Sequence, residues 1–99
     1  MAAVARVTVL LYGAFREFAG GRKRTAVEAT SVAEALDRVT EAHPALRERV
    51  RDEHGCLREH TNVFANEEEI RRLDGERTVL RDGDVVHVIP AISGGRRER

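Results

Sequence analysis

Hydrophobic and polar residues alternate at the start of the chain. In residues 6–12, Val7, Val9 and Leu11 recur with a period of two, which is the period of a strand with one buried face. Residues 22–29 mix β-branched residues with charged ones, a pattern typical of an edge strand whose charges discourage mispairing. The two stretches therefore predict a β-hairpin at the N-terminal end of the chain.

A second strand signal lies near the C-terminus. Residues 85–89 are β-branched apart from His87, and Gly83 gives a turn signal before them. Pro90 has no N–H to donate to a sheet ladder, so regular pairing should end there. The sequence thus predicts a turn, a strand that Pro90 ends, and a short tail too small to fold alone.

The pattern changes to helical spacing in the middle of the chain. Ser31 and Glu34 fit a capping box that begins a helix. Pro44 disfavours helical geometry in the residue before it and can itself begin a further turn or two. The positions expected to face the core are Val32, Leu36, Val39, Leu46 and Val50.

The remaining elements complete an α+β pattern. Residues 61–65 predict a third strand, Ile70 and Leu73 are expected to return to the core, and residues 51–60 are interpreted as a polar loop. Because the helix separates the two hairpins, the first and last strands can lie parallel at the centre of one sheet. The helix would then pack on one face of that sheet.

Composition limits the possible classes of function. The 99 residues suit one small domain, and 17 Lys and Arg balance 17 Asp and Glu, which argues against charge-driven binding to nucleic acid or membranes. No secretion signal or membrane-spanning run is visible. Cys56 is the only cysteine and Lys23 the only lysine. These features lead us to expect a cytoplasmic protein without an internal disulfide.

The C-terminal segment resembles a known family. Residues 82–95 read D-G-D-x-V-x-x-x-P-A-x-x-G-G, which is similar to the sulfur-carrier branch of the ubiquitin-like β-grasp proteins. That MoaD/ThiS branch includes ThiS, the small subunit of molybdopterin synthase and the cysteine-biosynthesis carriers. The resemblance extends to L-Y-G-A-F-R-E at residues 11–17 and N-V-F-A-N at residues 62–66. It implies a ubiquitin-like β-grasp fold with a mixed sheet and one main helix on one face.

The resemblance implies a chemistry carried by partner enzymes. A ThiF-like adenylating enzyme would use ATP to activate the Gly95 carboxylate, and sulfur from a rhodanese-like enzyme or a cysteine desulfurase would convert it to a thiocarboxylate. A cysteine-synthase-like enzyme or a molybdopterin synthase large subunit would accept that sulfur. The chain itself would supply no catalytic residue, metal or bound cofactor. Ser93, Gly94 and Gly95 form the expected activation tail, which suits a narrow nucleotide site because glycine lacks Cβ.

Four residues follow the expected reactive glycine. While Arg96, Arg97, Glu98 and Arg99 remain attached, Gly95 carries a peptide carbonyl and has no free carboxylate. We therefore expect a β-grasp domain over residues 1–95 and an extension over residues 96–99 that is removed by cleavage between Gly95 and Arg96. The family resemblance suggests a JAMM-type metalloprotease for this step.

One face of the sheet is a candidate docking surface. If Val86 and Val88 point to the core, the alternate residues of the same strand point the other way and join apolar residues of neighbouring strands. The opposite phase remains an equal alternative at this point. The candidate docking residues are Leu10, Tyr12, Phe64, Val85, His87 and Ile89.

Other functions compete with the sulfur carrier. A ubiquitin-like modifier joined through Gly95 to target lysines would share the activation step, and an interaction module that is never activated would keep its extension. His54, Cys56 and His60 could suggest a metal site, but a structural zinc site needs more ligands than this loop offers. A solvated loop is the favoured interpretation of these three residues.

Overall fold

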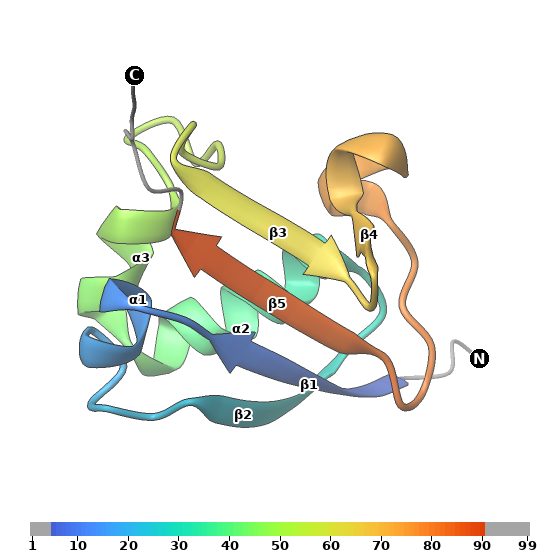
Figure 1. Ribbon diagram of the computed structural model, residues 1–99, viewed down its shortest axis with the longest axis horizontal. Coiled ribbons are helices and arrows are strands. Elements are labelled where there is room, and N and C mark those ends of the chain that lie inside the picture. The colour runs from blue at the N-terminus through green and yellow to red at the C-terminus, as the bar shows by residue number, and fades with distance from the viewer. Residues whose placement is uncertain (1–4, 91–99) are drawn as a thin grey trace, which may run out of the picture.

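A computed structural model, which describes residues 5–90, contains one five-stranded mixed sheet with the strand order β2-β1-β5-β3-β4 (Figure 1). The two N-terminal strands form an antiparallel hairpin, and β5 pairs parallel to β1 and antiparallel to β3. The predicted central parallel pair is therefore confirmed. The strands are β1 (Ala5–Leu11), β2 (Arg24–Ala29), β3 (Thr61–Ala65), β4 (Glu68–Glu69) and β5 (Val85–Pro90).

One face of this sheet carries the main helix. Helix α2 (Val32–Ala42) crosses that face, and α3 (Pro44–Val50) follows it directly. The short α1 (Ala14–Glu17) lies between β1 and β2, and two 3₁₀ turns, η1 (Ile70–Arg72) and η2 (Gly75–Arg77), precede β5. The α+β class and the ubiquitin-like β-grasp arrangement are thus confirmed.

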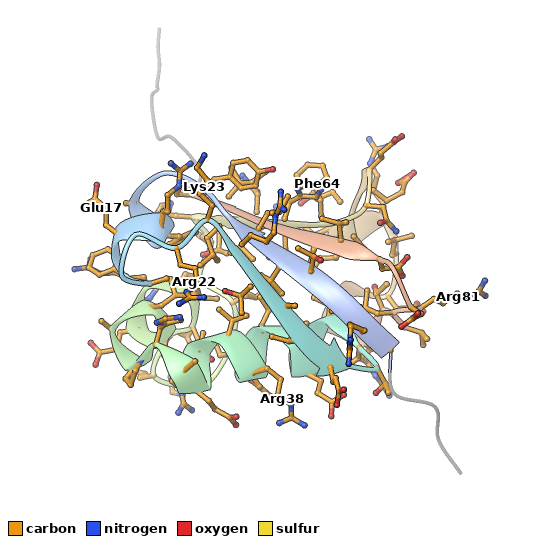
Figure 2. All side chains as sticks on the ribbon, turned by 90° about the horizontal axis from the view of Figure 1, so that it is seen from below. Glu17, Arg22, Lys23, Arg38, Phe64 and Arg81 are labelled. Carbon is orange, nitrogen blue, oxygen red and sulfur yellow. The ribbon has the colours of Figure 1, made fainter. Side chains whose placement is uncertain are left out.

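The core lies between the sheet and the helices. Val7, Val9, Val86 and Val88 are at most 1% exposed, which fixes the inward phase of both central strands. Burying each such side chain stabilises the fold by roughly 1.5–3 kcal/mol relative to leaving it in water. Figure 2 shows Arg38 of α2 and the aromatic ring of Phe64 on opposite sides of the sheet. The residues of the other phase therefore lie on the outer face.

The N-terminus of α2 is capped from both sides. The Ser31 hydroxyl accepts a hydrogen bond from the Glu34 N–H at 3.2 Å, as the capping box predicts. The Glu34 carboxylate in turn accepts from the N–H of Thr30 at 2.7 Å, one residue before the cap, and from the Thr30 hydroxyl at 3.1 Å. These bonds, helped by Arg38, hold the pKa of Glu34 below its ordinary value.

The structure corrects the expectation that Leu73 returns to the core. Ile70 is buried as expected, but Leu73 is 42% exposed. Residues three apart share a side of a 3₁₀ helix only while the helix continues. Here η1 ends at Arg72, and Leu73 has a non-helical backbone with φ −114° and ψ −139°, so its side chain does not follow that of Ile70 into the core.

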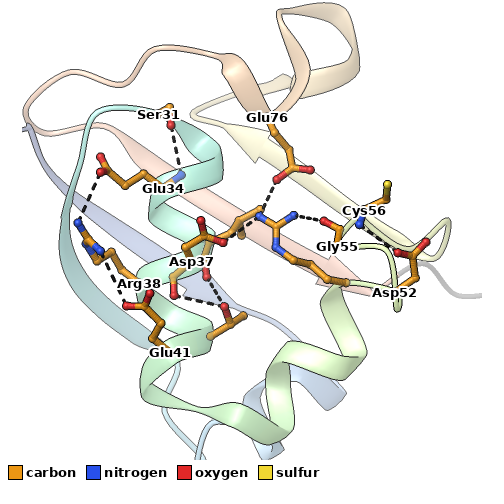
Figure 3. A network of polar contacts seen from close by, with 12 residues as sticks. Ser31, Glu34, Asp37, Arg38, Glu41, Asp52, Gly55, Cys56 and Glu76 are labelled. Carbon is orange, nitrogen blue, oxygen red and sulfur yellow. Dashed lines mark hydrogen bonds and ion pairs between the residues drawn. The ribbon is translucent and has the colours of Figure 1, made fainter.

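The structure also corrects the interpretation of residues 51–60 as a polar loop, because the first of them, Arg51, is buried. Its side chain is 8% exposed, and Nη2 lies 2.6 Å from Glu76 and 3.3 Å from Asp37. Nη1 donates to the Gly55 carbonyl at 2.8 Å, so partners from α2, η2 and the loop converge on one guanidinium (Figure 3). Burial would lower the pKa of Arg51, but Glu76 and then Asp37 outweigh it and raise that pKa.

We predict that Arg51→Ala lowers the free energy of unfolding by about 2 kcal/mol. Breaking a fully buried pair costs about 3–5 kcal/mol. The cost is smaller here because the side chains of Glu76 and Asp37 are 26% and 55% exposed and keep part of their hydration. Urea unfolding of the variant measures the effect. Arg38→Ala, which removes exposed ion pairs on α2, is the matched control and should change stability by less than about 1 kcal/mol. Equal losses in both variants would contradict the special role of Arg51.

Candidate functional site

The C-terminal end of β5 is held from both sides. Pro90 is the last residue of the strand and pairs with Thr61 of β3. On the other side, the N–H of Tyr12 donates to the Val88 carbonyl at 3.2 Å. Gly13 packs so closely that a Cβ on it would lie 3.0 Å from Pro90 Cγ, and its φ of +55° also favours glycine. The fold therefore fixes the point from which the chain continues past Pro90.

The predicted activation tail begins three residues after this point, at Ser93. Ser93, Gly94 and Gly95, and the predicted cleavage site before Arg96, lie outside the described residues. Their roles stay predictions. The described fold contributes the anchored strand end to which the tail is attached.

The outer face of the sheet brings the six candidate docking residues together. In the register, His87 of β5 lies between Leu10 of β1 and Phe64 of β3. Ile89, two residues beyond His87 on β5 and therefore closer to the tail, pairs with Asn62. None of the described helices covers this face (Figure 2). Every member is half-buried by its neighbours; the set, hereafter the outer face, is Leu10, Tyr12, Phe64, Val85, His87 and Ile89.

A polar contact lies within this apolar surface. The Tyr12 hydroxyl and His87 Nδ1 are 2.8 Å apart, and their rings lie 5.8 Å apart at 37°. The hydrogen bond connects β1 to β5 on the outer side of the sheet. Aromatic and aliphatic side chains around a few polar groups are typical of protein–protein interfaces.

The second candidate set lies in the loop after α3. The Asp52 carboxylate accepts hydrogen bonds from the N–H groups of His54 and Cys56 at 2.9 and 3.0 Å, and these bonds, chiefly that of Cys56, lower the pKa of Asp52. Cys56 and His60 are exposed. Among residues 5–90, no group of three or more His, Cys, Asp or Glu side chains is arranged to hold a metal ion. Asp52 thus organises the loop through backbone hydrogen bonds.

Within residues 5–90, no helix combines the length and the apolar character that crossing a membrane requires.

The mixed sheet with its central parallel pair and the helix on one face define a small protein of the ubiquitin-like β-grasp class. Comparison with known proteins gives the particular family. The model of the ThiS family matches residues 9–95, which is most of the chain. The chain belongs to the ThiS family.

The proteins similar to this chain include both modifiers and sulfur carriers. The chain is 39% identical over 87 residues to small archaeal modifier protein 1 of Haloferax volcanii, covering 86% of this chain and 95% of that protein. It is 29% identical over 91 residues to the sulfur carrier protein CysO of Mycobacterium tuberculosis, covering 90% and 98%. Among solved structures, the BexX/CysO complex of Amycolatopsis orientalis contains a chain with 31% identity and a TM-score of 0.80, covering 90% and 99%.

The sequence predicts the outer face but gives no sign of the groove beside the end of β5. Residues of α1, α3, the loop before β3 and Pro90 line this groove. No periodic pattern connects these segments, because each contributes only one to three residues.

Proposed function

We propose that this protein is a sulfur carrier whose reactive group is the Gly95 carboxylate. The observation that carries the proposal is the anchored end of β5 together with the family match, which ends at Gly95, four residues before the end of the sequence. Removal of residues 96–99, by a JAMM-type protease in our proposal, frees that carboxylate.

The chemistry requires no reacting group from the folded domain. The Gly95 carboxylate attacks the α-phosphorus of ATP on a ThiF-like enzyme, and pyrophosphate leaves. The terminal sulfur of a persulfide, formed on a rhodanese-like enzyme or a cysteine desulfurase, attacks the carbonyl carbon, and AMP leaves. A second thiol reduces the resulting acyl disulfide, which yields the thiocarboxylate and a disulfide. The chain therefore acts as a protein-bound substrate, and its partners are the enzymes.

The proposed sulfur acceptor is a biosynthetic enzyme. The four residues after Gly95 favour a cysteine-synthase-like acceptor, because the family resemblance includes such carriers made with extra C-terminal residues, and a molybdopterin synthase large subunit is the other candidate. The outer face is the proposed docking surface because it combines apolar, aromatic and polar side chains beside the strand that leads to the tail. The BexX/CysO complex is a precedent for a similar chain associated with a partner protein.

The intact mass of the protein isolated from its native cells tests this proposal. We expect a chain that has lost Arg96 to Arg99 and has one carboxylate oxygen replaced by sulfur. A full-length, unmodified mass under conditions of high sulfur demand would contradict the carrier function and favour an interaction module.

Similarity to small archaeal modifier protein 1 favours a second function. A modifier would use the same activation but transfer Gly95 to lysine amines of target proteins. Protein conjugates that survive a denaturing gel would support the modifier, whereas a free thiocarboxylate supports the carrier. Lys23 is exposed and is the only lysine, so Lys23→Arg separates lysine-linked chains of this protein from conjugates with other proteins.

A further inference from the structure

A groove of about 580 Å³ lies where β5 ends. The tip of β5 meets α1 and α3 at one end of the molecule (Figure 1). The size falls within the usual range of ligand-binding sites. The lining residues are Ala14, Phe15, Phe18, Glu48, Arg49, Arg58, His60 and Pro90.

The groove combines an apolar base with positioned cations. Phe15 is buried in the core, and Phe18 is partly buried against it. The Arg49 guanidinium lies over the Phe18 ring, 4.4 Å from its centroid. Arg58 Nε donates to the Glu48 carbonyl at 2.7 Å. These contacts restrict two long side chains that would otherwise move freely.

The free charge of the groove is positive. Within residues 5–90, neither Arg49 nor Arg58 forms an ion pair. Among the described residues that line the groove, Glu48 is the one acid, and the His60 imidazole can add an N–H donor for an anion. Guanidinium groups bind carboxylates through charge-assisted hydrogen bonds. An apolar peptide that ends in a carboxylate matches both parts of the groove.

The end of β5 directs such a peptide to this place. Pro90 is the last residue of β5 and also lines the groove, so residue 91 follows directly from the wall of the groove. Before β3 the chain turns, with the Thr61 N–H donating to the Arg58 carbonyl at 3.0 Å, so Arg58 and His60 line the groove and do not extend the β3 ladder. The five residues from Ala91 to Gly95 span at most about 17 Å, which is enough to reach across a groove of this size. Ala91 and Ile92 supply apolar side chains at the start of that segment.

We propose that this groove binds residues 91–95 of the processed chain, with the Gly95 carboxylate held by Arg49 and Arg58. This inference rests on the proposed function only in taking Gly95 as the C-terminus. In the chain that still carries residues 96–99, Gly95 has no carboxylate, and Arg96, Arg97 and Arg99 add positive charge to a segment whose binding to the groove requires a negative one. Cleavage therefore allows the bound state, and an activating enzyme must withdraw the tail to reach the carboxylate.

NMR spectroscopy of the isolated protein tests the proposal without any partner enzyme. Chain 1–95 contains the whole described fold and is compared with the same chain carrying a C-terminal carboxamide, which changes only the terminal charge. We expect the Phe18, Arg49, Arg58 and His60 signals to differ between the two forms and to converge at high salt. Identical groove signals in the two forms would overturn the proposal.

A titration of the Gly95 carboxyl provides a second readout. In chain 1–95 its pKa should lie below the ordinary α-carboxyl range of about 3.3–3.7 and return to that range in Arg49→Gln/Arg58→Gln. Arg58→Gln alone should act in the same direction while keeping the Arg49–Phe18 contact. Arg81→Gln, an exposed change before β5 at the opposite end of the sheet, is the matched control and should leave the titration unchanged. The same Gly95 pKa in all variants would overturn the proposal that the groove binds the tail. Sulfur loading of chain 1–95 is independent of this result and tests the carrier function separately.

Discussion

A chain that ends at Gly95 will accept sulfur from its activating system, whereas the chain that ends at Arg99 will not. The reason is chemical: adenylation requires a free carboxylate, and in the longer chain Gly95 is joined to Arg96 by a peptide bond. The carboxylate of Arg99 is four residues farther along, on a residue with a bulky cationic side chain, so it does not suit a narrow nucleotide site. The difference should be all-or-none.

The measurement is intact mass after both chains are incubated with a ThiF-like enzyme, ATP and a persulfide donor. Omitting ATP gives the background. A chain that ends at Gly94 is the matched control, because it keeps a glycine carboxylate and shortens the reach by one residue; its loading should fall below that of chain 1–95. Loading of the full-length chain on Arg99 would contradict the need for cleavage.

The central elements of the fold were predictable because their signals are local. The alternation in β1 and the β-branched run of β5 fix both strands, and the capping box begins α2 at the expected residue. Their inward valines are almost fully buried. A helix between two hairpins allows β1 and β5 to be parallel neighbours, but the family resemblance was needed to give this exact topology.

The errors came from residues whose environment is set by distant segments. Arg51 opens a polar stretch, yet it is buried because Asp37 and Glu76, from two other elements, approach its guanidinium. Spacing in the sequence gives no sign of such a cluster. Leu73 shows the converse, because an apolar residue becomes exposed when a 3₁₀ turn ends before it.

One part of the candidate site could also be predicted from the sequence, and the other could not. The outer face follows from strand phase once Val86 and Val88 are known to be inward, so its membership was accessible to sequence reasoning. The groove depends on residues as far apart as Phe18, Arg49 and Pro90, which only the folded chain brings together. Strand periodicity thus revealed a surface, whereas the hollow required the tertiary structure.

Leu10→Asp will weaken binding of the activating or sulfur-accepting enzyme by about 30-fold or more, corresponding to about 2 kcal/mol for a central interface residue. Leu10 pairs with His87 near the middle of the outer face, so a carboxylate there would be desolvated by any partner that covers this surface. Because Leu10 is half-buried and outside the core cluster, we expect the domain to stay folded.

Ile89→Asp, closer to the tail on β5, should show the same loss of binding. Val79→Asp introduces the same charge at a 71% exposed position away from the outer face and should bind normally. Calorimetric titration against the partner gives the affinities, and circular dichroism confirms folding. Val88→Asp, which points into the core, should instead unfold the domain, so its loss of binding would be accompanied by a loss of structure. Normal affinity of folded Leu10→Asp and Ile89→Asp would mean that partners recognise another surface, because no enzyme could cover this face without burying both carboxylates.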